Sequence, residues 1–227
     1  MTVVDNLLKI KKELLPTVEL VAVSKFHPVE PIRQAYEAGQ RIFGESRPQE
    51  LFQKVGQLPQ DIRWHFIGHL QTNKLKMVLP YVELVHSVDS VRLLEAIRRY
   101  CENNGLSVDV LIEVHIAQEE TKSGFSLSEA EELLTGDLTA VCGDVVRVRG
   151  LMAMASLTDD EALIRREFQS LTALYRRIGA YREAGSVATL AHFDTLSFGM
   201  SNDYHIAMEE GATLVRIGTD IFGPREY

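Results

Sequence analysis

Short runs of apolar, often β-branched residues alternate along the chain with longer segments in which apolar residues recur every three or four positions. The short runs are typical of buried strands, and the longer segments have the period of amphipathic helices. Strands are therefore expected at residues 20–24, 41–43, 63–67, 82–88, 108–115, 145–152, 193–197 and 213–217. Helices are expected at residues 28–38, 47–55, 72–79, 90–104, 126–134, 159–183 and 201–210. The Ser128/Glu131 pair is expected to cap the helix at 126–134.

The regular alternation of strand and helix predicts the architecture. Strands separated by helices are usually parallel, and eight such units form an α/β fold of the (β/α)8 barrel or TIM barrel type. An open, doubly wound sheet is the alternative. No linker or shift in composition divides the chain, so a single domain over residues 1–227 is expected.

Both ends of the chain depart from the repeated unit. Residues 2–15 carry an extra amphipathic pattern, which stops at Pro16 before the first strand. The last strand is followed only by residues 219–227, which show no helical pattern. The extra N-terminal helix is therefore expected to cover the side of the barrel that lacks a final helix.

Composition and charge narrow the functional classes. The 227 residues are 45% hydrophobic and 25% charged, which is an ordinary globular composition. The net charge of −8 argues against a nucleic acid as partner. No apolar run approaches the roughly 20 residues of a membrane span, and no signal-peptide core follows Met1. Cys101 and Cys142 stand alone without a CxxC spacing, which favours reduced thiols in a cytoplasmic protein.

The histidines do not predict a metal site. His65 and His69 stand four residues apart, as some metal-binding pairs do on a helix. Gly68 and the strand-like residues 64–67 put these two histidines on no common helix face, and no glutamate follows His65. No metal ligand is therefore expected in this region.

The first strand ends in a lysine, within the segment Val21-Ala-Val-Ser-Lys25. A lysine fixed at the end of a buried strand is partly desolvated, which favours its neutral amine. A neutral amine is a nucleophile that can form a Schiff base with an aldehyde. The alternative is a lysine whose side chain simply extends to the solvent.

The seventh and eighth strands both run into glycine-containing turns. One turn contains Gly199 and Ser201 ahead of a helical pattern, and the other contains Gly218 and Thr219. Such turns present backbone N–H groups, the hydroxyls add donors, and barrels of this type often hold phosphate at this place. The alternative is a serine helix cap and two ordinary turns.

An amine on the first strand and a phosphate site on the last two point to a phosphorylated aldehyde. Two ligands fit this description, namely pyridoxal 5′-phosphate and a sugar phosphate in an aldolase. Arg216 lies between Val215 and Ile217 on the last strand. If its side chain points inward it needs an acceptor, and the pyridine nitrogen of pyridoxal phosphate would supply one. The alternative is an outward arginine that bridges strand and helix.

Motifs along most of the chain resemble those of the pyridoxal phosphate homeostasis protein family. They occur in the expected order from about residue 20 to residue 223. The matching segments are Val21-Ala-Val-Ser-Lys25, Phe43-Gly-Glu45, Gln49-Glu50, Trp64-His-Phe-Ile-Gly68, Leu70-Gln-Thr-Asn-Lys74, His86-Ser-Val-Asp89, Lys122-Ser-Gly124, Gly150-Leu-Met152, Leu196-Ser-Phe-Gly-Met-Ser-Asn-Asp203 and Val215-Arg-Ile-Gly-Thr219.

This resemblance implies a fold-type III barrel, similar to the N-terminal domain of alanine racemase, that binds pyridoxal phosphate. The cofactor-binding residues that it implies are Lys25, Met152, Ser201, Arg216, Gly218 and Thr219. In this arrangement Lys25 carries the cofactor as an aldimine and Arg216 faces the pyridine nitrogen. Ser201, Gly218 and Thr219 hold the phosphate, and Met152 lies near the ring. Lys122 matches a family position near the mouth of the pocket.

The chain departs from the family pattern at two places. The family commonly has Ser-Lys-Thr-Lys-Pro after the first strand, whereas this chain has Phe26 and His27 between Lys25 and Pro28. The family also commonly has asparagine where Ser46 stands. Cofactor transfer or fine positioning is therefore expected to differ here.

Three functions fit these residues. The first is a cofactor carrier that limits free pyridoxal phosphate, works as a cytoplasmic monomer and passes the cofactor transiently to apo-enzymes. The others are an amino-acid racemase and a Schiff-base aldolase. Alanine racemases use a second, β-rich domain that contributes a catalytic tyrosine, and 227 residues leave no room for one. Arg216 would keep the pyridine nitrogen neutral, which makes the ring a poor electron sink. The carrier, without robust catalysis, is therefore favoured.

Overall fold

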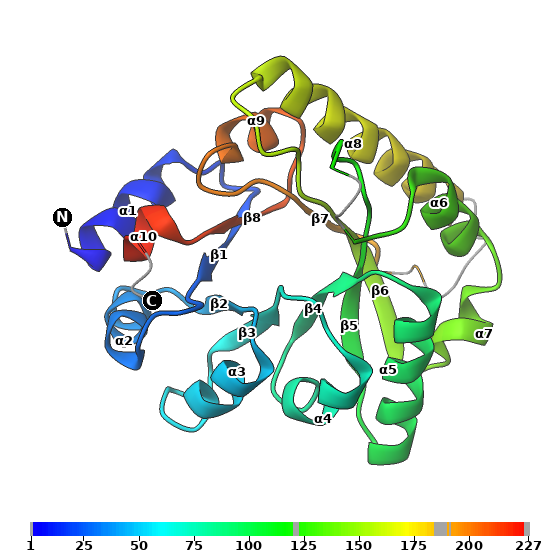
Figure 1. The fold of residues 1–227 in the computed structure, drawn as a ribbon, viewed down its shortest axis with the longest axis horizontal. Coiled ribbons are helices and arrows are strands. Elements are labelled where there is room, and N and C mark those ends of the chain that lie inside the picture. Colours follow the sequence, from blue (N-terminus) through cyan, green and yellow to red (C-terminus); the bar gives the residue numbers. More distant parts are fainter. Residues whose placement is uncertain (1, 120–122, 184–189, 191, 225–227) are drawn as a thin grey trace.

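Eight strands pair in parallel and in chain order, and the last strand pairs with the first to close a barrel. The computed structural model describes residues 2–119, 123–183, 190 and 192–224 (Figure 1). The strands are β1 (Glu19–Val23), β2 (Ile42–Glu45), β3 (Arg63–Phe66), β4 (Leu84–Val88), β5 (Val108–Glu113), β6 (Val146–Met152), β7 (Thr195–Ser197) and β8 (Leu214–Ile217). The expected α/β barrel is confirmed, and the open sheet is excluded.

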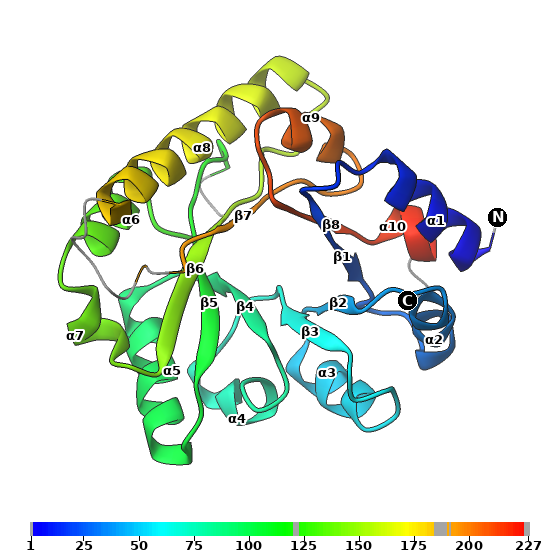
Figure 2. The same cartoon turned by 180° about the vertical axis from the view of Figure 1, so that it is seen from behind.

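Helices surround the barrel on its outside, as the two opposite views show (Figures 1 and 2). The helices are α1 (Val3–Glu13), α2 (Val29–Glu37), α3 (Pro48–Val55), the 3₁₀ helix η1 (Thr72–Lys74), α4 (Leu75–Val78), α5 (Val91–Asn104), α6 (Leu127–Thr135), α7 (Leu138–Cys142), α8 (Glu161–Glu183), α9 (Tyr204–Glu209) and α10 (Thr219–Phe222). In the part of the chain that the structure describes, no helix combines the length and apolar content that crossing a bilayer requires.

The short helix α10 directly follows β8, so the expectation that no helix follows the last strand was wrong. Its four residues are too few to show a helical period in the sequence. Helix α1 lies beside α10 in both views, and Asn6 Nδ2 donates to the carbonyl oxygen of Ile221 at 3.2 Å. The N-terminal helix therefore covers the closing seam of the barrel as expected, but it does so together with α10.

The N-terminus of α6 also differs from the expectation. Its capping box is formed by Ser126 and Glu129 rather than by Ser128 and Glu131. Ser126 Oγ accepts from Glu129 N at 3.2 Å, and Glu129 Oε2 accepts from Ser126 N at 2.8 Å. The backbone of Ser126 is extended, so this residue is the last one outside the helix and its side chain is the cap.

The side chains of β1 alternate between two layers of the core. Leu20 and Ala22 pack in the large core between the barrel and its helices, whereas Val21 and Val23 pack with residues of β2 and β8. Val21 is in register with Arg216 on β8. Paired residues of neighbouring strands point to the same face of a sheet, so Arg216 points into the barrel.

Candidate functional site

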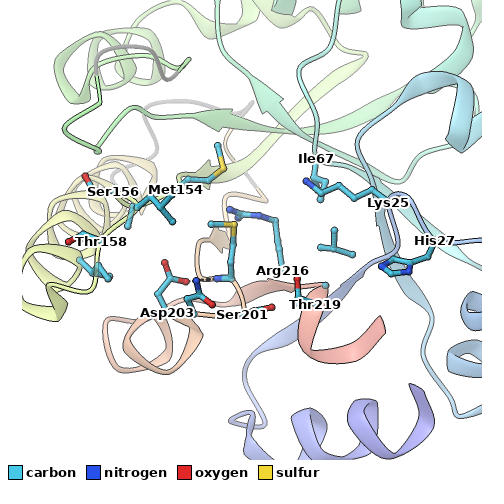
Figure 3. Close-up of a pocket in the computed structure, with 17 residues that line it drawn as sticks. Lys25, His27, Ile67, Met154, Ser156, Thr158, Ser201, Asp203, Arg216 and Thr219 are labelled. Atoms are coloured by element: carbon cyan, nitrogen blue, oxygen red, sulfur yellow. Dashed lines mark hydrogen bonds between the residues drawn. The ribbon is translucent and has the colours of Figure 1, made fainter. Parts of the chain in front are cut away.

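A cavity of about 370 Å³ lies at the carboxyl ends of the barrel strands (Figure 3). Its walls come from the segments after β1, β3, β6 and β7, and from β8 with the start of α10. Five of the six expected cofactor-binding residues line the cavity, namely Lys25, Ser201, Arg216, Gly218 and Thr219. Barrel closure thus brings the first strand and the last two together at the end where barrels of this type place their binding sites.

Met152, the sixth expected residue, lies below the cavity. It is 2% exposed and packs in a small cluster with Leu84 and Leu111. Met154 belongs to the same cluster, lies two positions further along and lines the cavity. The structure therefore places Met154, rather than Met152, at the cavity wall.

Lys25 follows the buried Ser24 immediately after β1. Figure 3 shows the side chains of Lys25 and Arg216 at the cavity, which they reach from the neighbouring strands β1 and β8. The next residue, Phe26, has a φ of +67°. This left-handed conformation turns the chain sharply towards α2, and it is rare for a bulky residue. The turn leaves Lys25 at the strand end with its side chain in the cavity.

Arg216 is 5% exposed, which excludes the outward orientation that the sequence left open. Its Nη1 donates to the carbonyl oxygen of Ser197 at 3.0 Å and to Ser197 Oγ at 2.7 Å, and its Nη2 donates to the carbonyl oxygen of Ala153 at 3.0 Å. Further N–H groups of the guanidinium remain for a ligand in the cavity. Burial lowers the pKa of Arg216 to about 10, so the side chain is still charged near neutral pH.

A chain of buried polar groups continues inward from Arg216. Ser197 Oγ lies 3.2 Å from His86 Nδ1, and His86 Nε2 lies 2.9 Å from His65 Nδ1. Burial lowers the pKa of His65 to about 3 and holds the pKa of His86 well below its ordinary value. Both imidazoles are therefore neutral. Their inward direction follows from strand alternation, but no sequence pattern indicates that the two rings would meet.

His65 and His69 lie in different surroundings. His65 contacts His86 inside the barrel, whereas the exposed His69 pairs with Asp89 at 3.1 Å. Among the residues that the structure describes, no group of three or more His, Cys, Asp or Glu side chains is arranged to hold a metal ion.

The turn between β7 and α9 forms one side of the cavity. Gly199 has a φ of +95°, and a side chain there would come within 2.5 Å of Ala207 Cβ, so only glycine fits this turn. Asp203 Oδ1 accepts from Met200 N at 2.6 Å and holds the turn in shape. Helix α9 begins at Tyr204 and not at residue 201 as expected, which leaves Ser201 in the turn facing the cavity.

The junction of β8 and α10 forms the adjacent side. A Cβ at Gly218 would lie 3.1 Å from the carbonyl oxygen of Val23, so the glycine allows β8 to lie close to β1. Thr219 begins α10. The first N–H groups of a helix have no partner within it, and these groups lie next to the Thr219 hydroxyl at the cavity. Together with Ser201, the junction supplies donors suited to an anion.

An acidic residue that the sequence did not single out lies near the same end of the barrel. Glu113 ends β5 and is 7% exposed. Burial, with a further contribution from Asp89, raises the pKa of Glu113 to about 7, while the charge of Arg216 opposes this shift. Glu113 therefore titrates near neutral pH beside the residues of the site.

The two departures from the family pattern lie close to Lys25. His27 lines the cavity, and its ring centroid lies 5.2 Å from that of Phe222 in a tilted arrangement. Ser46 contacts Gly68 so closely that a Cβ at Gly68 would lie 2.2 Å from the Ser46 carbonyl oxygen. Lys122, expected at the pocket mouth, lies outside the described residues.

Comparison with known proteins identifies the family. A model of the alanine racemase N-terminal domain matches residues 2–226. The pyridoxal phosphate homeostasis protein of Aquifex aeolicus is 40% identical over 210 residues, which cover 92% of this chain and 88% of that protein. Its namesake from Escherichia coli is 37% identical over 216 residues, which cover 92% and 87%. The chain belongs to the pyridoxal phosphate homeostasis protein family.

Solved structures agree with this membership. PipY of Synechococcus elongatus without pyridoxal phosphate is 34% identical, with a TM-score of 0.88 over 98% of this chain and 100% of PipY. PipY with pyridoxal phosphate bound gives 33% identity and a TM-score of 0.84 over the same shares. Alanine racemase from Streptomyces coelicolor is 19% identical and covers 97% of this chain but 58% of its own, with a TM-score of 0.74. It shares the fold with the homeostasis protein family.

Proposed function

We propose that this protein binds pyridoxal 5′-phosphate through Lys25 and acts in pyridoxal phosphate homeostasis. The observation that carries the proposal is that Lys25 and Arg216, from the neighbouring strands β1 and β8, line one cavity together with the turns at Ser201 and Thr219. The cavity volume lies within the range that small-molecule sites occupy, roughly 300–1,000 Å³. PipY, a relative covered over its whole length, has been solved with pyridoxal phosphate.

The residues of the cavity fit the chemical groups of this cofactor. The aldehyde needs an amine, and Lys25 supplies it: condensation forms a carbon–nitrogen double bond and releases one water molecule. The phosphate needs donors, which Ser201, Gly218 and Thr219 supply from hydroxyls and turn N–H groups. The pyridine nitrogen needs a donor, and Arg216 is anchored with N–H groups to spare.

The same residues favour a carrier over an enzyme. When bound, the cofactor supplies an electron sink, and the strength of that sink depends on protonation of its ring nitrogen. Arg216 donates hydrogen bonds but has no proton to give up near neutral pH, so it favours the unprotonated ring and a weak sink. His65 and His86 are neutral and already hydrogen-bonded, so neither is a ready acid. A racemase or aldolase activity would need a stronger acid or base than these.

The remaining expectations complete the proposal. The protein works as a single domain and a monomer in the cytoplasm and passes its cofactor transiently to apo-enzymes. Cys101 and Cys142 are free and buried, which agrees with the proposed reducing compartment. Leu157 and Met200, at the cavity, expose 87% and 38% of their surface and offer apolar contacts to a partner. Light scattering on the purified protein tests the monomer.

Borohydride trapping tests the proposed function. The protein is mixed with pyridoxal phosphate, reduced with borohydride and digested, and the pyridoxylated peptide is identified by mass spectrometry. The expected adduct is on Lys25, and Lys25→Ala should abolish both the adduct and the absorption of the bound cofactor. Lys76→Ala, at an exposed position on α4, serves as a lysine control. An adduct on another lysine, with the absorption retained in Lys25→Ala, would overturn the proposal.

A further inference from the structure

A buried cluster of charges lies behind the turn that presents Lys25. Lys54 Nζ, on α3, donates to Glu45 Oε1 at 2.7 Å and to Glu50 Oε1 at 2.7 Å. The side chain of Glu45 is fully buried, that of Lys54 is 6% exposed and that of Glu50 is 19% exposed. A buried ion pair is costly to desolvate and contributes little stability by itself, so its placement calls for another explanation.

The cluster holds the two residues that flank Lys25. Lys54 Nζ donates to the carbonyl oxygen of Ser24 at 2.9 Å, and Ser24 Oγ donates to Glu45 Oε1 at 2.5 Å. On the other side, Phe26 N donates to Glu50 Oε1 at 2.7 Å. The backbone is thus fixed immediately before and immediately after the residue that enters the cavity.

The conformation fixed in this way is a strained one. Phe26 has a φ of +67°, which a phenylalanine adopts only where the surroundings enforce it. Its amide is held by Glu50, and its ring lies under the guanidinium of Arg47 at 4.3 Å. Without these contacts Phe26 would relax to an ordinary conformation, and the direction of the Lys25 side chain would change with it.

We propose that Glu45, Glu50 and Lys54 form a turn clamp that positions Lys25 for its reaction with the aldehyde. The inference rests on the proposed function of Lys25. It also explains why two lysines so close together have different roles. The amine of Lys54 is buried and hydrogen-bonded to Ser24, Glu45 and Glu50, which keeps it away from the cavity, whereas Lys25 lines the cavity.

Comparison of two ligands separates positioning from folding. Pyridoxine 5′-phosphate has the ring and phosphate of pyridoxal phosphate but an alcohol in place of the aldehyde, so it cannot react with Lys25. In Lys54→Met the dissociation constant for pyridoxal phosphate should rise between roughly 10- and 100-fold, as misplaced reacting groups do. The dissociation constant for pyridoxine 5′-phosphate should stay within twofold of wild type, because the ring and phosphate contacts are unchanged.

A milder pair of variants keeps the test decisive if Lys54→Met does not fold. Glu50 is the most exposed member of the clamp. Glu50→Ala removes the acceptor of Phe26 N and should weaken pyridoxal phosphate binding alone, whereas Glu50→Gln keeps an acceptor oxygen and should restore it. Phe26→Gly added to Glu50→Ala should also restore binding, because glycine adopts a positive φ without strain.

Three results would overturn the turn clamp. One is unchanged pyridoxal phosphate affinity in Lys54→Met and Glu50→Ala, and another is an equal loss of both ligands in Glu50→Ala. The third is a failure of Phe26→Gly to restore any binding. If wild type and Lys25→Ala bind pyridoxal phosphate equally well, the proposed function is wrong, and so is the turn clamp that depends on it.

Discussion

Arg216 donates from a single nitrogen to both the carbonyl oxygen and the hydroxyl of Ser197, at 3.0 and 2.7 Å. Because a guanidinium only donates, the Ser197 hydroxyl accepts a hydrogen bond from Arg216 and donates one to His86 Nδ1. His86 then carries its hydrogen on Nε2 and donates to His65 Nδ1. His65 in turn carries its hydrogen on Nε2, a buried atom with no hydrogen-bond partner. One arginine thus sets the tautomer of two histidines.

This series of hydrogen bonds predicts the protonation state and the tautomer of both histidine rings. His65 and His86 should be neutral with the hydrogen on Nε2 between pH 5 and 8, since their pKa values are lowered by burial. Nitrogen-15 NMR of histidine-labelled protein distinguishes the tautomers, and the exposed His205 provides a reference signal. Ser197→Ala should remove the donor to His86 Nδ1 and shift the signals of His86 more than those of His205. A hydrogen on His86 Nδ1 in wild type would contradict this order.

The hydrogen-bond donors to the phosphate can be tested by comparing the binding of pyridoxal phosphate with that of pyridoxal. Loss of a hydroxyl that donates to a charged acceptor costs about 1.5–3 kcal/mol, or roughly 10- to 150-fold in affinity. The Ser201→Ala and Thr219→Ala double variant should therefore lose pyridoxal phosphate binding while its weaker binding of pyridoxal, which lacks the phosphate, is little changed. Ser107→Ala, at an exposed position before β5, is the control. Equal losses for both ligands would place the phosphate elsewhere.

Catalysis should be slow. Added L-alanine should shift the absorption of the bound cofactor by exchange at Lys25, but neither racemisation nor transamination should follow at an appreciable rate. A weak electron sink alone removes several powers of ten in rate. Incubation in deuterated water with mass spectrometry of the amino acid measures the exchange at Cα. Exchange near about 1 per second or faster would make this protein an enzyme.

Glu113 predicts a pH dependence of stability. Its pKa in the folded state, about 7, lies above the ordinary value, so the folded protein binds the proton more tightly than the unfolded chain. The free energy of unfolding therefore loses a contribution as the pH rises from about 4.5 to 7, by roughly 2–3 kcal/mol. Glu113→Gln should unfold at the same denaturant concentration as wild type at pH 4.5 and at a higher one at pH 8. The exposed Glu132→Gln should show no such gain, and an equal gain in both variants would refute the assignment.

The sequence predicts the barrel because each strand and long helix carries its own period, and it predicts most of the site because strand ends can be located. The features that the sequence does not predict depend on local backbone conformation or on contacts between distant residues. Helices α7 and α10 are too short to show a period, and the cap at Ser126 depends on which residue is extended. Met154 lines the cavity and Met152 does not, because the depth of an inward-facing residue depends on barrel geometry, while a contact of Met152 with the cofactor ring stays a prediction.

The contacts among buried polar groups were beyond sequence patterns for a physical reason. Ser197 and His86 are separated by 111 positions, and Lys54 reaches Ser24 across 30. Each of these residues is, on its own, an unremarkable polar residue near a strand or on a helix. Only the register of neighbouring strands and the packing of α3 on the barrel decide which of them meet.

The pairing of β1 with β8 also determines when in the life of the chain the site exists. Val21 and Arg216 lie in register across this seam, so Lys25 and Arg216 come to line one cavity only after the first and last strands have met. During synthesis the chain folds from its N-terminus while later residues are still inside the ribosome. The nascent protein therefore cannot assemble its binding site until β8 has emerged. Binding of the cofactor would therefore report that the barrel has closed.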